Sequence, residues 1–267
     1  MYPYGEIRKV PLDYEGITSS AFAVQRQDTL PKGGTKWVEC GVVGQNYLLI
    51  PNADVKEMAL SIADECNADF KEAKTFFDGR RYFYGLVSNT HTVEIEEGDD
   101  VALGLGFWNS YDGSTALKMK MFLMRLVCTN GMMTNDHFSS YRFRHDSSSE
   151  GYEDEMIKVV DTINGCGDSV EKIAKNFRAM TNLEMDLDAL GTARTSIPAL
   201  PTTTWGKITD RYLEMYTNDD DNSALEKNTM WDFYNACTDV LWHEKKTTVA
   251  SFQHNAYVTD NLLKCVA

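Results

Sequence analysis

Long apolar runs are missing from this sequence: none approaches the roughly 18–20 residues that a membrane-spanning helix needs. The first ten residues contain Glu6, Arg8 and Lys9 and no apolar core segment, so they do not form a secretory signal. Only 6 of the 267 residues are proline, and no low-complexity tract occurs. We therefore expect a folded protein that stays in the cytoplasm, where it is made.

Paired cysteines are also missing. The 6 cysteines are scattered and form no Cys-x-x-Cys pair, which argues against a zinc ribbon or finger. A chain of this length buries a core without disulfides, so we expect reduced and mostly buried thiols. The sequence also contains no phosphate-binding loop, no nucleophile-elbow motif and no His-Glu-x-x-His. Gly104-x-Gly106 lacks the third glycine of a dinucleotide fingerprint, and we predict no cofactor.

Positive charge is scarce. Lys and Arg total 26 against 40 Asp and Glu, and the net charge is −14. Such a charge repels nucleic acid and anionic lipid from most of the surface. Any nucleic-acid site must therefore be a local cluster of cations on an acidic protein.

The hydrophobic periodicity changes along the chain. Strand patterns dominate residues 37–145 and helical patterns dominate residues 152–267, which is the order of an α+β fold with an antiparallel sheet followed by packed helices. We divide the chain into an N-terminal arm or loop (1–36), an α+β core (37–194), a linker (195–204) and a C-terminal helical region packed on the core (205–267).

One helix is predicted from Val55 to Phe77, because apolar residues recur at helical spacing over six turns before Gly79. Ser223 and Glu226 form a capping box for a helix that continues to Leu241. Strands are expected at 42–50, 80–87, 92–96, 101–108, 117–128 and 141–145.

Cations on two strands suggest a nucleic-acid site. If strands 117–128 and 139–145 pair, Lys118, Lys120, Arg142 and Arg144 could share one side of the sheet, where they would suit phosphates. The simpler interpretation is a solvated face whose cations pair with Glu94 and Glu96. The full set of expected contacts adds one arginine and two tyrosines that could stack on bases: Lys118, Lys120, Arg125, Arg142, Arg144, Tyr141 and Tyr82.

Two other arrangements are weaker candidates. Cys128 with His145 or His243 could form a nucleophile pair, although a cysteine at the end of an apolar strand is usually a core residue. The acidic run 218–222 resembles a cation-binding loop but lacks the glycine and glutamate that an EF-hand requires, so we predict no metal site.

Four ordered motifs resemble the phage/plasmid-like protein family known as domain of unknown function 932. They are an Asn-Ser-Tyr-Asp-Gly-Ser turn at 109–114, a strand end at 125–131, an Arg-His pair at 144–145 and a helix at 231–243. Tyr111 is a departure, since histidine is common there in the family. The motif residues are Asn109, Ser110, Asp112, Gly113, Cys128, Asn130, Gly131, His145, Asn235 and His243.

The resemblance implies an origin in a phage or plasmid and hence the host cytoplasm, but no activity. Strands followed by a long helix are similar to single-strand annealing proteins such as RecT and Red-beta, an analogy of fold only. We therefore expect a DNA-associated protein that could bind single-stranded DNA in recombination or annealing and could assemble as a homo-oligomer.

Two alternatives remain open. The acidic surface could engage a host or phage protein, as an anti-defence protein would, without binding nucleic acid. An enzyme is less favoured. It would need one pocket formed by Asn109, Asp112, Asn130, His145, Asn235 and His243.

Overall fold

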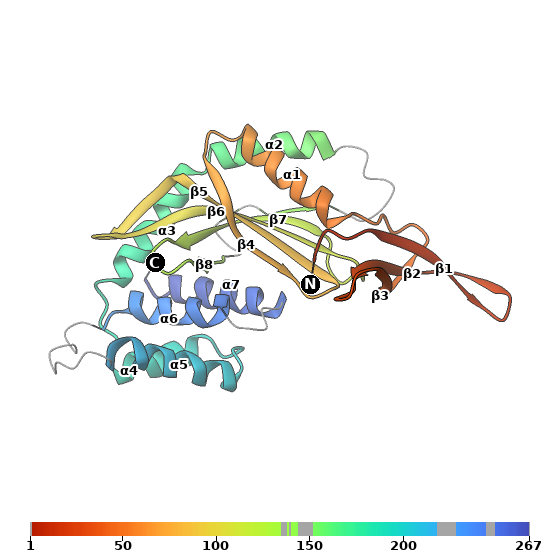
Figure 1. Ribbon diagram of the computed structural model, residues 1–267. Helices are drawn as coiled ribbons and strands as arrows, with labels where there is room; N and C mark the ends of the chain where they lie inside the picture. Colours follow the sequence, from red (N-terminus) through yellow and green to blue (C-terminus); the bar gives the residue numbers. More distant parts are fainter. Residues whose placement is uncertain are drawn as a thin grey trace. The chain divides into compact units, whose positions relative to one another are not determined.

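The computed structural model describes residues 2–134, 138, 140–143, 152–217, 228–243 and 249–266 (Figure 1). The elements in chain order are β1 (Ile7–Tyr14), β2 (Ile17–Thr29), β3 (Thr35–Gly44), α1 (Asn52–Glu65), β4 (Phe70–Phe77), β5 (Arg81–Glu96), β6 (Asp99–Ser110), β7 (Leu117–Arg125), β8 (Asn130–Met132), β9 (Ser140–Phe143), α2 (Tyr152–Asn164), α3 (Gly167–Met180), α4 (Leu187–Ser196), α5 (Thr202–Thr217), α6 (Met230–His243) and α7 (Val249–Leu263).

The strands form two sheets. One has the order β1-β2-β3, and the other has the order β4-β5-β6-β7-β8 with β9 also paired to β7. Every pairing with a defined register is antiparallel. Apart from α1, the helices follow the strands in the chain, which confirms the α+β class.

The chain divides into two compact units. Unit 1 comprises Met1–Asn89, Leu105–Lys120 and Ser140–Gly165, and unit 2 comprises Thr90–Gly104, Met121–Ser139 and Cys166–Ala267. The long strands β5, β6 and β7 therefore contribute residues to both units. Each unit is described below by itself.

Unit 1 contains the sheet β1-β2-β3, and its strands β1 and β2 lie within residues 1–36, where an arm or loop was expected. The expectation failed because the apolar residues of these strands do not alternate strictly with polar ones. The pairing is also irregular: the register of β2 shifts against β1 between Pro11 and Asp13, and against β3 between Val24 and Gln25. Val24 and Cys40 from this sheet form a buried cluster with Val43.

The helix predicted from Val55 to Phe77 is shorter than expected. Helix α1 ends at Glu65, and residues 70–77 form β4. Val55, Ala59 and Ile62 are buried on α1, as the helical pattern predicts. The apolar residues beyond position 66 happen to continue the same phase, but their backbone pairs with β5 instead.

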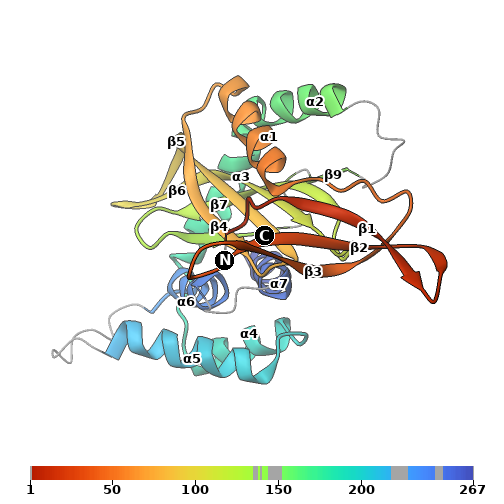
Figure 2. The same cartoon turned by 45° about the vertical axis from the view of Figure 1, so that its right-hand side comes forward.

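Helices α1 and α2 contact each other and lie side by side over one face of the sheet in unit 1 (Figures 1 and 2). In unit 2, α6 is the central helix and contacts α3, α5, α7 and β8. The side chains of Trp231 and Phe233 on α6 are fully buried.

Helix α6 begins later than predicted. Its cap is formed by Thr229 and Asp232: the Asp232 carboxylate accepts from the backbone N–H and hydroxyl of Thr229, at 2.9 and 2.7 Å. The expected box at Ser223 and Glu226 lies outside the described residues. Among the helices that are described, none is both long and apolar enough to cross a membrane.

Candidate nucleic-acid interface

Strand pairing brings three of the expected cations to one side of the sheet in unit 1. In the β7–β9 register, Lys118 lies opposite Arg142 and Lys120 lies opposite Ser140. Residues directly opposite each other in an antiparallel pair point to the same face, and alternate residues of a strand share a face. Lys118, Lys120 and Arg142 therefore lie on one face, as the sequence predicts.

Two further lysines, not anticipated from the sequence, occupy strand β4. Lys71 lies opposite Val87, and Lys74 lies opposite Gly85. The register shifts between Glu72 and Lys74, so an irregularity places Lys71 and Lys74 on the same face although they are three residues apart. Reading β4 as helix concealed this arrangement.

Contacts of two glycines show that both groups of cations share one face. A side chain at Gly106 would meet the rings of Trp108 and Phe83 at 2.7 and 2.8 Å, and one at Gly104 would overlap the ring of Phe122. Phe83 shares a face with Gly85 and hence with Lys74, while Phe122 shares a face with Lys120. Neighbouring aromatic rings therefore occupy the space beside both glycines. We call the residues Lys71, Lys74, Lys118, Lys120 and Arg142 the basic face.

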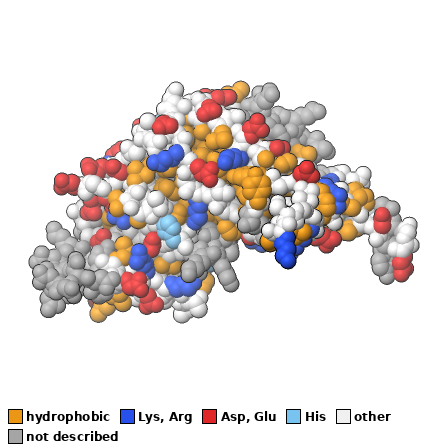
Figure 3. Space-filling view, in the orientation of Figure 1, with side chains coloured by type: hydrophobic (Ala, Val, Ile, Leu, Met, Phe, Trp, Pro, Cys, Tyr) orange, Lys and Arg blue, Asp and Glu red, His pale blue; other side chains and the backbone are white. Residues whose placement is uncertain are grey.

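The one acidic side chain on the described strands of unit 1 in this sheet, Glu72, projects to the side opposite the basic face. Glu72 lies opposite Leu86, and its carboxylate accepts from Lys56 of α1 at 3.3 Å. Among the described residues of β4, β5, β6, β7 and β9 in unit 1, no Asp or Glu occupies the side of the basic face. Elsewhere Asp and Glu are spread over the visible surface with Lys and Arg between them (Figure 3). The basic face is thus a local exception on an acidic protein.

The basic face has two edges with an apolar strip between them. Phe83 and Trp108 occupy the strip and are 1% and 8% exposed. β4 and β7 are three strand spacings apart, about 14 Å. Partial burial lowers the pKa of Lys74 to about 8 because desolvation disfavours its charged form. An anion bound beside Lys74 would raise this pKa again, because it stabilises the charged form of the lysine.

Arg125 has a structural role in unit 2. Its Nε donates to Asp99 Oδ1 at 2.6 Å, and Asp99 Oδ2 accepts from Trp231 Nε1 at 2.8 Å. The side chains of Arg125 and Asp99 are 17% and 9% exposed. Because a carboxylate neutralises this guanidinium below the surface, Arg125 does not belong to a phosphate-binding surface.

The expected tyrosines are also engaged elsewhere. Tyr82 is 1% exposed, and its hydroxyl contacts that of Tyr4 at 3.0 Å, so its ring has no free face for a base. Tyr141 lies opposite Met119, away from the basic face, and its hydroxyl bonds to Thr162 of α2. Arg144 lies outside the described residues.

The first family motif forms a structural turn in unit 1. The buried Asn109 amide donates to the carbonyl of Ile50 and to Asn52 Oδ1, both at 2.9 Å. Ser110 Oγ bonds to the backbone of the turn at Thr115, and Asp112 Oδ1 accepts from Ser114 N–H at 2.9 Å. Gly113 adopts φ +72°, which favours glycine. These bonds fix the β6–β7 connection to the start of α1.

The second and fourth motifs meet in unit 2. Oriented with its nitrogen toward the surrounding acceptors, the Asn130 amide donates to His243 Nε2 at 2.9 Å and to Asp239 Oδ1 at 3.2 Å. Arg211 Nε holds the other oxygen of Asp239 at 2.6 Å. Gly131 leaves room for the Trp242 ring, which occupies the place of a side chain. This network joins α6 to β8.

The two motif groups belong to different units. Asn109 and Asp112 lie in unit 1, whereas Asn130, Asn235 and His243 lie in unit 2. Asn235 is 1% exposed, and its side-chain amide has no hydrogen-bond partner among the described residues. His145 lies outside the described residues.

Neither weaker candidate gains support from the geometry. His243 Nε2 lies 3.2 Å from the backbone carbonyl of Cys128, while the Cys128 thiol accepts from Arg125 at 3.6 Å. The imidazole therefore contacts the backbone of Cys128. Within the described part of the chain, no group of three His, Cys, Asp or Glu side chains could hold a metal ion. The acidic run 218–222 lies outside that part.

Comparison with known proteins gives one result. A family model described as "Domain of unknown function (DUF932)" matches residues 39–263, which is more than half of the chain. Neither a curated protein nor a solved structure matches.

Proposed function

The chain belongs to the DUF932 family, whose description states no activity, and from the basic face of its sheet we propose that it binds single-stranded nucleic acid. The supporting observation is the arrangement of five cations, Lys71, Lys74, Lys118, Lys120 and Arg142, on one side of the strands of unit 1. Phosphates of one strand would contact Lys118, Lys120 and Arg142 at one edge and Lys71 and Lys74 at the other.

Charge explains why such a site must be local. With a net charge of −14, the protein gains no non-specific attraction for a polyanion at long range. Binding would depend on short-range contacts with the basic face, and it would weaken steeply with salt. Action on DNA in the host cytoplasm, in recombination or annealing of a mobile element, is the biological role that we propose.

The test is a fluorescence-anisotropy titration with a labelled 30-nucleotide single strand between about 50 and 300 mM salt. Each phosphate contact on a single strand contributes about 0.7 to the slope of log affinity against log salt. The double variant Lys118→Ala, Arg142→Ala should reduce the slope by about 1.4 and the affinity about 10- to 30-fold at 0.1 M salt.

The control is the double variant Lys172→Ala, Lys175→Ala, which removes two exposed cations from α3. Both double variants have the same formal charge, so general electrostatics affects them equally. If wild-type protein does not bind at 50 mM salt, or if the two variants lose affinity to the same extent, the proposal is wrong.

A further inference from the structure

Four polar groups converge in unit 2, where the turn after β7 meets the end of α6. His243 Nε2 lies 2.9 Å from the side-chain amide of Asn130 and 3.2 Å from the carbonyl oxygen of Cys128. The same end of the Asn130 amide lies 3.2 Å from Asp239 Oδ1 and 3.2 Å from the Cys128 carbonyl. We call these four groups the acceptor cluster: Cys128 O, the Asn130 amide, Asp239 Oδ1 and His243 Nε2.

Hydrogen bonds of the Asn130 amide do not satisfy this cluster. The other end of the amide lies 3.3 Å from the backbone carbonyl of Asn235. If the amide nitrogen faces the cluster, its oxygen faces that carbonyl, and two acceptors meet without a hydrogen. If the nitrogen donates to Asn235 instead, the amide oxygen faces the three other acceptors of the cluster. Asn130 is 1% exposed, and opposed acceptors below the surface are costly unless a positive charge lies between them.

A proton on His243 would relieve only part of this conflict. Protonated Nε2 could donate to the Asn130 oxygen or to the Cys128 carbonyl. The 3.2 Å contact between the Asn130 oxygen and Asp239 Oδ1 would still lack a hydrogen. A metal ion within the cluster relieves all of these contacts at once, because each acceptor becomes a ligand.

The distances within the cluster suit metal ligands. For bonds of about 2.1 Å, two ligands at a right angle lie about 3.0 Å apart, and two opposite ligands lie about 4.2 Å apart. The contacts of the cluster span 2.9 to 3.2 Å, with 3.9 Å between His243 Nε2 and Asp239 Oδ1. The side chains of His243 and Asp239 are 44% and 20% exposed, so water can complete the coordination.

Two features hold the ligands in place. Thr129 lies between Cys128 and Asn130 and has φ +55°, a left-handed conformation that is strained for a β-branched residue. Strain of this kind is concentrated at functional sites. Arg211 Nε donates to the second oxygen of Asp239 at 2.6 Å and thereby fixes the carboxylate, as hydrogen-bond partners of metal ligands commonly do.

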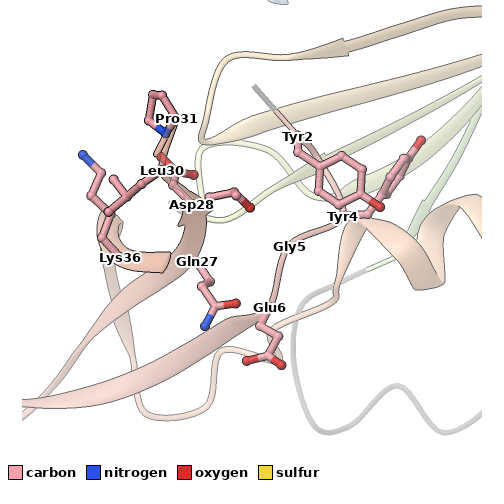
Figure 4. A pocket seen from close by; sticks show the side chains of 10 residues that line it. Tyr2, Tyr4, Gly5, Glu6, Gln27, Asp28, Leu30, Pro31 and Lys36 are labelled. Atoms are coloured by element: carbon pink, nitrogen blue, oxygen red, sulfur yellow. The ribbon is translucent and has the colours of Figure 1, made fainter. Parts of the chain in front are cut away.

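A cavity among the N-terminal residues of unit 1 differs in this respect. Its volume is about 660 Å³, and Tyr2, Tyr4 and Asp28 are among the residues that line it (Figure 4). Both oxygens of Asp28 accept from Arg26, at 2.7 and 2.9 Å. The carboxylate of this cavity is therefore satisfied within the protein, whereas the acceptor cluster is not.

We propose that the acceptor cluster binds a divalent transition-metal ion, independently of the basic face. Its protein ligands are Cys128 O, Asn130 Oδ1, Asp239 Oδ1 and His243 Nε2, while Asn130 Nδ2 donates to the Asn235 carbonyl. Three oxygens and one imidazole suit Mn²⁺, whereas Mg²⁺ and Ca²⁺ take oxygen ligands. Only two of these ligands are ionisable side chains, so the site is compatible with the absence of a group of three His, Cys, Asp or Glu in the described part of the chain.

The test is electron paramagnetic resonance of the full chain titrated with Mn²⁺, in excess Mg²⁺ that occupies non-specific sites on the acidic surface. We expect one tightly bound Mn²⁺ per chain, with nitrogen hyperfine coupling from the imidazole of His243. His243→Gln should remove this coupling and weaken binding at least about tenfold, the smallest loss typical even for a hydrogen-bond partner of a metal ligand. His243 is 44% exposed, so this variant should fold.

Two carboxylate variants provide a matched comparison. Asp239→Asn alters a ligand, whereas Asp210→Asn alters an exposed carboxylate of α5 outside the cluster. Both variants have the same net charge, so the general attraction of cations to an acidic protein affects them equally. Asp239→Asn should bind Mn²⁺ at least about tenfold more weakly than Asp210→Asn. Absence of Mn²⁺ binding in excess Mg²⁺, equal affinity in the two Asp variants, or unchanged nitrogen coupling in His243→Gln would each overturn the proposal.

Discussion

Lys74 allows the basic face to be tested by pH. Burial lowers the pKa of its ammonium to about 8, whereas the ordinary value is 10.5. Lys74 is therefore mostly charged at pH 7 and almost wholly neutral at pH 9.5. If a phosphate of the bound strand lies beside it, affinity must fall as the pH rises through about 8, because the phosphate stabilises only the charged form.

The size of the effect follows from the salt dependence of one phosphate contact. One phosphate contact contributes about 0.7 to the slope of log affinity against log salt. Over the tenfold range from 1 M to 0.1 M salt, this contribution corresponds to a gain of about fivefold in affinity. We expect single-strand affinity to fall by about that factor between pH 7 and pH 9.5. Linkage requires the converse as well: bound nucleic acid should raise the pKa of Lys74.

The control is Lys74→Arg, which keeps its charge throughout this pH range. Anisotropy titrations at both pH values should show the loss in wild-type protein and little or none in the variant. All other ionisable groups are the same in both proteins, so their contribution cancels in the comparison. An equal pH dependence in the two proteins would refute the placement of Lys74 beside a phosphate.

Two predictions concern the stability of unit 2, each read from thermal or urea denaturation. Asp99→Ala should lower the free energy of unfolding by about 3–5 kcal/mol, because Arg125 and the indole N–H of Trp231 both lose their acceptor below the surface; an unchanged midpoint would contradict the role assigned to Arg125. Gly131→Ala should cost about 1–3 kcal/mol by forcing the Trp242 ring to move, whereas Gly167→Ala, where nothing lies within 4 Å, should cost far less.

Periodicity identified most strands and helices, and it failed where backbone pairing competes with local pattern. Phe70, Phe76 and Phe77 continue the helical phase of α1, yet they form a strand because β5 provides a partner for their backbone. The spacing of apolar residues within 70–77 does not reveal this pairing, because the pairing depends on the neighbouring strand β5 and not on the segment itself. The same limit explains why β1 and β2 were read as an arm.

The basic face was predictable in part. Alternation along β7 placed Lys118 and Lys120 together, and pairing with β9 added Arg142 as expected. Lys74 could not be found from the sequence, because its face depends on the register shift in β4. Arg125 also could not be excluded, since its partner Asp99 is 26 residues away in the sequence.

The most direct test is lysine footprinting, with brief acetylation of the protein alone and in the presence of a 30-nucleotide single strand, read by mass spectrometry. If single-stranded nucleic acid binds the basic face, Lys118 and Lys120 should be protected, while Lys172 and Lys175 on α3 should react equally in both samples. Equal reactivity of Lys118 and Lys120 with and without the oligonucleotide, at a concentration where the protein is saturated, would contradict the proposal.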